Sequence, residues 1–333
     1  MKRLLSTTAV ALLASLGAAQ AGQVNIIIQD FDVQDEQNVI NEIDAGAIVD
    51  SSQEGTNVAN LISLEDVTPG AGDGAGVSLD DGGVALDPIL VSLFPGIASF
   101  VAGHGDIYAA AQLFADVQRV TNDASASLGA AGVAQTGLNV ANTFAVTDAY
   151  DGTDTGDVYL VYQSFGSWFA DGGEVGAPGG NEETRQVVEN TIGAVGDINS
   201  SSQEGTNVAN LISISDDGGS LDPGELVGNQ MLLVQSAGGA SRLTKQLVKN
   251  KAHSGDDING LTQNALNAVN VVSMTLDGDQ ASGLTVIGQK TYENFDQSIV
   301  NRAVAHSVAT GVAQSGTNVG NVVTVGVTVE NGS

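Results

Sequence analysis

The sequence contains no cysteine. Disulfide bonds, zinc–thiolate sites and thiol nucleophiles are therefore excluded. Aromatic residues make up only 4% of the chain, which argues against a core filled by large rings and favours thin, closely packed β layers. The three histidines, His104, His253 and His306, lie in unrelated contexts, and no set of nucleophile, base and acid stands out. We therefore expect a protein that is not an enzyme.

Basic residues are scarce: 10 Lys and Arg stand against 39 Asp and Glu, for a net charge of −29. A surface of this charge makes nucleic acid a poor partner, because the phosphate backbone is itself negative. Cations are better partners. The 42% share of apolar residues, with abundant Val, Ile and Thr, argues against a disordered chain despite the charge.

Long apolar runs are also few. The first one, Leu4–Leu16, follows Lys2 and Arg3 and precedes the A-x-A sequence at Ala19–Ala21. This three-part pattern over residues 1–21 is typical of a secretory signal peptide, so we expect an exported protein that is secreted to the cell surface or the extracellular space. The next apolar stretch, Leu86–Gly103, contains a Pro-Gly pair, and no transmembrane segment is expected.

The chain does contain repeats. The thirteen residues SSQEGTNVANLIS occur at Ser51–Ser63 and again, unchanged, at Ser201–Ser213. They belong to a pattern, Q-x-G-x-N-x-x-N, that recurs with small changes, and a related pattern, Q-x-[VI]-x-N-x-[AI]-x-[AS], precedes each copy. The first Gln and the second Gln are 17 residues apart in four copies and 16 apart in the first. We expect one repeat domain over residues 22–333, with units at about 37–64, 118–146, 186–214, 246–274 and 297–325.

Each half of a unit repeats its residue types at every second position, which is the period of a β-strand. The residues between the halves are mostly Gly, Ala and Ser, as in the stretch GAVGDINSS, and favour a turn. The predicted fold class is all-β: a β-solenoid of stacked β-arches, built from five imperfect strand–turn–strand repeats with looped-out insertions rich in Asp and Gly. The insertions vary in length while the repeats do not, so the repeats are expected to pack together.

One face of each predicted strand combines amides with small apolar groups. A buried amide without a partner costs about 1–3 kcal/mol. If the units stack in register, each amide can pair with the same amide in the next layer, about 4.7 Å away. The residues expected to form this assembly ladder are Gln37, Asn41, Gln53, Asn57, Gln118, Asn122, Gln135, Asn139, Gln186, Asn190, Gln203, Asn207, Gln246, Asn250, Gln263, Asn267, Gln297, Asn301, Gln314 and Asn318.

In these repeats the chain resembles curlin-repeat and Fap-type subunits of bacterial functional amyloid fibres. They too carry Gln, Gly, Asn and Ala in strand–turn–strand units, or imperfect Gln/Asn repeats with linkers of variable length. The resemblance implies a structural subunit that self-assembles into extracellular amyloid-like fibres of the cell surface or biofilm matrix. It implies the chain itself as the main partner, joined by a nucleator subunit and an outer-membrane export pore. The alternatives are a monomeric calcium-binding β-solenoid adhesin and, third, an exported β-helix enzyme acting on polysaccharides.

The insertions carry much of the acidic charge. Carboxylates near glycines suit calcium, a hard cation that binds oxygen ligands; the alternative is solvated acidic turns. The calcium candidates are Asp216, Asp217, Asp222 and Glu225, and separately Asp151, Asp154 and Asp157. One insertion also carries an aromatic cluster between Tyr159 and Phe169, either a contact patch for a partner or a hairpin packed on the stack.

Overall fold

The computed structural model describes residues 24–31, 36–66, 107–149, 158–166, 168–169, 175–176, 183–217, 230–239, 243–277 and 284–328. Throughout these ranges the regular elements are strands, and no helix occurs in them. No helix within the same ranges is long and apolar enough to cross a membrane. The strands pair in parallel, except in one short hairpin formed by β8 (Trp168–Phe169) and β9 (Val175–Gly176). The prediction of an all-β, solenoid-like fold is confirmed at this level.

The strands fall into three sets. The five-stranded sheet consists, in spatial order, of β1 (Val24–Phe31), β4 (Ile107–Phe114), β7 (Val158–Phe165), β12 (Gln230–Ala237) and β16 (Leu284–Thr291). The first arch strands are β2 (Gln37–Val49), β5 (Val117–Ala131), β10 (Thr184–Ala194), β13 (Thr244–Ser254) and β17 (Phe295–Ala305). The second arch strands are β3 (Ser52–Asp66), β6 (Ala134–Ala149), β11 (Ile198–Asp217), β14 (Ile258–Ala268) with its continuation β15 (Val271–Asp277), and β18 (Ala309–Val319) with its continuation β19 (Val322–Thr328).

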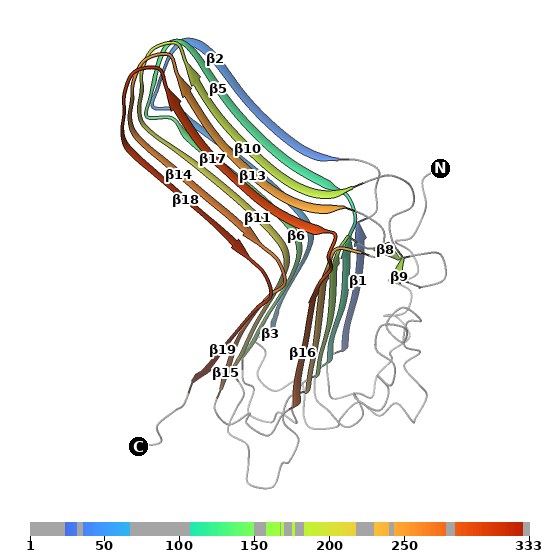
Figure 1. Ribbon diagram of the computed structural model, residues 1–333. Helices are drawn as coiled ribbons and strands as arrows, with labels where there is room; N and C mark the ends of the chain where they lie inside the picture. Colours follow the sequence, from blue (N-terminus) through green and yellow to red (C-terminus); the bar gives the residue numbers. More distant parts are fainter. Residues whose placement is uncertain are drawn as a thin grey trace, which may run out of the picture.

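One strand of each set, taken in chain order, makes a layer. The layers lie within residues 24–66, 107–149, 158–217, 230–277 and 284–328, and we number them 1 to 5. In Figure 1 the colours run from blue to red across each sheet, so the layers are stacked in the order of the chain. Each layer therefore pairs only with the layer before it and the layer after it.

The structural unit has one strand more than the sequence pattern predicts. The segments between the repeats were expected to loop out, yet layers 2 to 5 each take from them a strand of the five-stranded sheet, and the strand of layer 1, β1, precedes the first repeat. These strands are short, eight residues each. They face the second half of the second arch strands, as Figure 1 shows.

Side chains alternate between the interior and the surface along the first arch strands, as the period of two requires. In β5 the inward positions include Gln118, Val120, Asn122 and Ala124, all fully buried. The inward valines, Val39, Val120, Val188 and Val248, form a column that Ile299 completes. This column packs against glycines of the second arch strands and, in layer 4, against Ala265.

The second arch strands change partner halfway along. In β6 both Ala141 and Asn142 are buried, so the alternation shifts by one residue at this point. Before the shift the strand faces the first arch strands, and after it the strand faces the five-stranded sheet. Phe114 and Phe165 fill the corner with parallel rings whose centroids are 5.6 Å apart. A larger apolar cluster, which includes Phe144 and Tyr159, lies between the two sheets beyond the corner.

A column of left-handed residues lies near the start of each second arch strand, two residues before it in layers 1 and 2 and at its third residue in layers 3 to 5. Equivalent positions in layers 1 to 5 have φ between 48° and 75°, and they are occupied by Asp50, Gly132, Ser200, Gly260 and Gly311. A residue with a Cβ is strained at positive φ, whereas Gly is not. The turn therefore favours Gly at this position, and layers 1 and 3 carry a less suitable residue.

Ser200→Gly should stabilise the fold. Relief of the left-handed strain at φ 48° outweighs the extra backbone entropy of Gly, for a gain of about 0.5–1 kcal/mol in the free energy of unfolding. The matched control is Ser202→Gly, an exposed strand position nearby, where Gly should lower stability by a similar amount. Urea denaturation followed by circular dichroism measures both. A loss of stability in Ser200→Gly would contradict the assigned backbone conformation.

Candidate functional site

The glutamines of the first arch strands form a continuous hydrogen-bonded column. Gln186 donates from Nε2 to Gln118 Oε1 at 2.8 Å, and Gln246 donates to Gln186 Oε1 at 2.8 Å. The same contact joins Gln118 to Gln37 and Gln297 to Gln246. The backbone register places the five residues at one position of successive strands.

The glutamines of the second arch strands form a second column. Its members are Gln53, Gln135, Gln203, Gln263 and Gln314, joined by four amide contacts of 2.5–2.9 Å. The asparagines expected in the ladder form two further columns, one on each arch strand, with contacts of 2.8–2.9 Å. The structure thus brings all twenty predicted residues into four columns.

Two more columns were not predicted. One runs along the five-stranded sheet through Gln29, Gln112, Gln163, Gln235 and Gln289, with contacts of 2.7–2.9 Å. The other runs through the last Asn of the motif Q-x-G-x-N-x-x-N, at Asn60, Asn142, Asn210, Asn270 and Asn321. The Asn column was visible in the motif itself. The Gln column has only a short signal in the sequence, a Gln after an apolar run as in AAAQLF.

The three Gln columns share one direction of hydrogen bonding, and the three Asn columns share the opposite direction. Each Gln amide donates to the Gln of the preceding layer, for example Gln203 to Gln135 at 2.9 Å. Each Asn amide donates to the Asn of the following layer, for example Asn207 to Asn267 at 2.9 Å. The two terminal layers consequently present different atoms of the same amides. Layer 5 ends in Gln oxygens and Asn nitrogens, and layer 1 ends in Gln nitrogens and Asn oxygens.

The second arch strands are offset from the other two sets by a fraction of a layer. Gln53 of layer 1 donates both to Asn41 O of its own layer, at 3.0 Å, and to Asp123 O of layer 2, at 2.9 Å. On the other side, Asn60 of layer 1 donates to Leu113 O of layer 2 at 2.7 Å. Each second arch strand therefore lies between two successive layers of its neighbours.

This offset makes the two ends of the stack different. In layer 1 the amide of Gln53 is buried, because β5 of layer 2 covers it. In layer 5 the equivalent Gln314 is exposed, and among the described strands none lies above it. The second arch strand projects at the layer 5 end, whereas β1 and β2 project at the layer 1 end.

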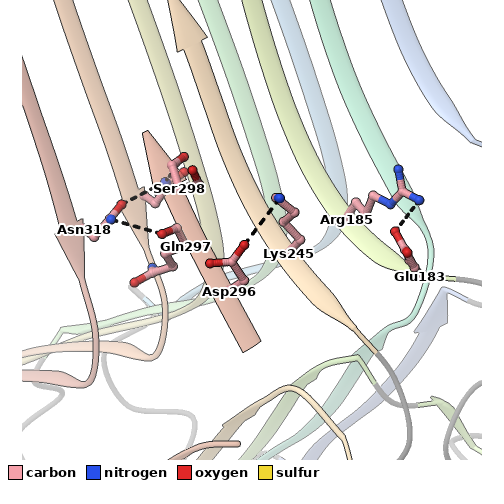
Figure 2. Close-up of polar contacts among 8 residues, drawn as sticks. Glu183, Arg185, Lys245, Asp296, Gln297, Ser298 and Asn318 are labelled. Atoms are coloured by element: carbon pink, nitrogen blue, oxygen red, sulfur yellow. Dashed lines mark hydrogen bonds and ion pairs between the residues drawn. The ribbon is translucent and has the colours of Figure 1, made fainter. Parts of the chain in front are cut away.

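The outward faces of the first arch strands carry several charged side chains that pair between layers. Lys249 pairs with Glu189 at 2.6 Å, and Lys245 pairs with Asp296 at 3.3 Å, each bridging adjacent layers. Figure 2 shows the second pair, together with Arg185 and Glu183 on the edge of layer 3. Nearer the other end, Asp123 has a raised pKa, first because it is partly buried and second because Glu42 lies beside it.

The calcium candidates lie mostly outside the described residues. Asp216 and Asp217 end strand β11, whereas Asp151, Asp154, Asp157, Asp222 and Glu225 are not among the described residues. Within the described part of the chain, no three His, Asp or Glu residues come together in a way that would hold a metal ion. The calcium site stays a prediction.

The aromatic cluster divides between two locations. Tyr159 and Phe165 are fully buried between the sheets. Strand β8, which contains Trp168 and Phe169, lies against β1 and β4 of the five-stranded sheet. This arrangement favours the interpretation of the cluster as a hairpin packed on the stack.

No family model matches this sequence, and comparisons with curated proteins and with solved structures found no similar protein.

Proposed function

We propose that this protein is the structural subunit of an extracellular fibre and that it polymerises by adding further copies to the two ends of its stack. The observation that carries the proposal is the set of six amide columns, which run through every layer and stop at the terminal layers, where each amide lacks the amide neighbour that an adjacent layer supplies elsewhere in the stack. The fivefold stack built from imperfect strand–turn–strand repeats acts in this proposal as a preassembled section of the fibre. Export through the predicted signal peptide would place it at the cell surface.

The open ends support polymerisation over a monomeric role. A solenoid that functions as a monomer needs its end layers covered, because they expose unpaired backbone groups that pair readily with another chain. In layer 5, Gln314 and Asn318 are exposed and the apolar residues Val323 and Val325 are about half exposed. Nothing in the described part of the chain covers them.

The two ends also fit each other. Gln oxygens and Asn nitrogens at layer 5 match Gln nitrogens and Asn oxygens at layer 1. In this junction the projecting β18 would lie against the projecting β1 and β2 of a second copy. The same arrangement occurs within one molecule, where side chains of β14 donate to backbone carbonyls of β17 and Gln289 of β16 donates to Asn270 O. Addition of a copy would continue all six columns without a break.

The test is the behaviour of the purified chain. We expect unbranched filaments by electron microscopy, thioflavin T fluorescence that rises with a lag, and fibre diffraction with a meridional reflection at about 4.7–4.8 Å. Because the subunits are strongly acidic, polymerisation at neutral pH should be slow in low salt and faster as salt screens the repulsion. A protein that stays monomeric for days at high concentration and high salt, even with preformed aggregates as seeds, would contradict the proposal.

A further inference from the structure

The described basic side chains are distributed unevenly along the stacking axis. Layer 1 carries five exposed acidic side chains on or beside β2 and β3: Glu36, Glu42, Asp44, Asp50 and Glu54. Between Arg3 and Arg119 the sequence contains no Lys or Arg, so no cation of layer 1 balances them. The described basic side chains instead concentrate in layers 4 and 5, at Lys245, Lys249, Lys251, Lys290 and Arg302.

A single outward column shows the sorting most clearly. The register aligns Glu42, Asp123, Thr191, Lys251 and Arg302 at one position of the five first arch strands. The column is acidic in layers 1 and 2, neutral in layer 3 and basic in layers 4 and 5. Glu42 and Arg302, at its two ends, are both exposed.

We propose that Arg302 of one copy pairs with Glu42 of the next copy and that this pair selects the layer 5 to layer 1 orientation of the junction. The proposal rests on the proposed fibre function and names the partner surface as a second copy of this chain. If a second copy continues the β-sheet in register, its Glu42 takes the place next to Arg302 at the spacing of adjacent strands, about 4.8 Å. Opposite charges at adjacent positions of paired strands attract, and like charges repel.

Neighbouring columns support the same junction. Two positions before Arg302, Val300 is 39% exposed, and the aligned residue of layer 1 is Ile40, which is 62% exposed. The junction would place these two apolar side chains side by side and remove both from water. Asp296 would lie near Glu36 of the next copy, but Lys245 already compensates its charge.

The opposite arrangement, in which two layer 1 ends meet, is disfavoured. It would place the uncompensated acidic side chains of one copy against those of another. The carboxylates of Glu42 and Asp123 already repel each other within a single copy, and a second acidic layer would add to this repulsion, whereas Arg302 would offset it.

The test uses charge reversal at the junction. Arg302→Glu alone and Glu42→Arg alone should each raise the critical concentration for filament growth at low salt by about threefold to tenfold, because one attractive pair becomes a repulsive one. An equimolar mixture of the two variants should recover the wild-type value, since each junction in an alternating filament again joins opposite charges. The double variant Arg302→Glu/Glu42→Arg should recover it as well.

The control for net charge is Arg185→Glu, which makes the same change in layer 3, away from both ends. The junction pair is overturned if Arg302→Glu and Glu42→Arg polymerise like the wild type, if Arg185→Glu is as damaging as Arg302→Glu, or if the mixture fails to recover. In these cases wild-type filaments still form and the fibre proposal stands. If the wild type forms no filaments under any condition, the fibre proposal fails and this inference fails with it.

Discussion

Asn207→Leu should destabilise the molecule by about 3 kcal/mol, although Leu has the same number and branching of side-chain heavy atoms as Asn and is more apolar. Asn207 is fully buried in the middle layer. Its amide accepts a hydrogen bond from Asn139 at 2.9 Å and donates to Asn267 Oδ1 at 2.9 Å and to Leu247 O at 3.1 Å. With Leu at this position, Asn139, Asn267 and the carbonyl of Leu247 would each lose the hydrogen bond that Asn207 makes with them. Water cannot supply these hydrogen bonds inside the stack. Urea denaturation with a linear extrapolation gives the change in unfolding free energy.

Thr206→Leu is the matched control, because it introduces the same side chain one position away. Thr206 lies on the outward face and is only partly buried, so its replacement should change the unfolding free energy by about 0.5 kcal/mol or less. Equal losses in Asn207→Leu and Thr206→Leu would show that the assignment of inner and outer faces is wrong.

Gly205→Val should destabilise the fold by about 3 kcal/mol, although Val has the higher β-propensity. A Cβ at Gly205 would lie well inside van der Waals distance of Val248 Cγ1 and 3.1 Å from Val188 Cγ1. Both valines are fully buried, so they have no free space to move into. The two arch sheets would have to separate, and the amide contacts on either side of Gly205 would lengthen.

Two further variants separate this effect from a general intolerance to substitution. Gly205→Ala should cost less, since layer 4 naturally carries Ala265 at the aligned position. Val248→Ala in the Gly205→Val background should recover part of the lost stability by making room for the new side chain. A Gly205→Val protein as stable as the wild type would mean that the arch strands do not approach each other as closely as described.

The arch could be predicted from the sequence because its signals are local and periodic. The paired glutamines have a nearly constant separation, from 17 residues in most units to 16 in the first, and the alternating positions carry the same residue types in each copy. The register then follows, because a shift by one residue would move every Gln and Asn to the outer face. The twenty predicted ladder residues all obey this rule.

The five-stranded sheet could not be found in the same way. Its glutamines lie at irregular distances before the next arch: Gln118 follows Gln112 by six positions, whereas Gln186 follows Gln163 by 23 positions. The hairpin of β8 and β9 occupies the longer gap. A search for a constant step therefore misses the third strand, and its short apolar segments contain few polar residues to mark an alternation. The segments that contain it were interpreted as acidic loops and, between Tyr159 and Phe169, as a contact patch or a packed hairpin.

The shift of alternation at the corner also lacks a local signal. Strand β6 continues without a break from Gln135 past Asn142, while its inward side changes between Ala141 and Asn142. The two Asn of each motif are three residues apart, an odd spacing that a strict period of two would place on opposite faces. In the structure both are inward, because each faces a different sheet. The odd spacing was thus the mark of a corner.

The stacking of the layers in chain order has a consequence for biogenesis. A layer that has just folded presents the same projecting strand and the same Gln and Asn side chains whether the next segment to arrive belongs to its own chain or to another. In the proposed fibre, folding within a subunit and growth between subunits are therefore one reaction, distinguished only by covalent connection. A chain that meets a fibre end while still partly unfolded can complete its layers there one after another, with the end acting as a template. Conversion at the tip would then make a stable free monomer unnecessary for growth.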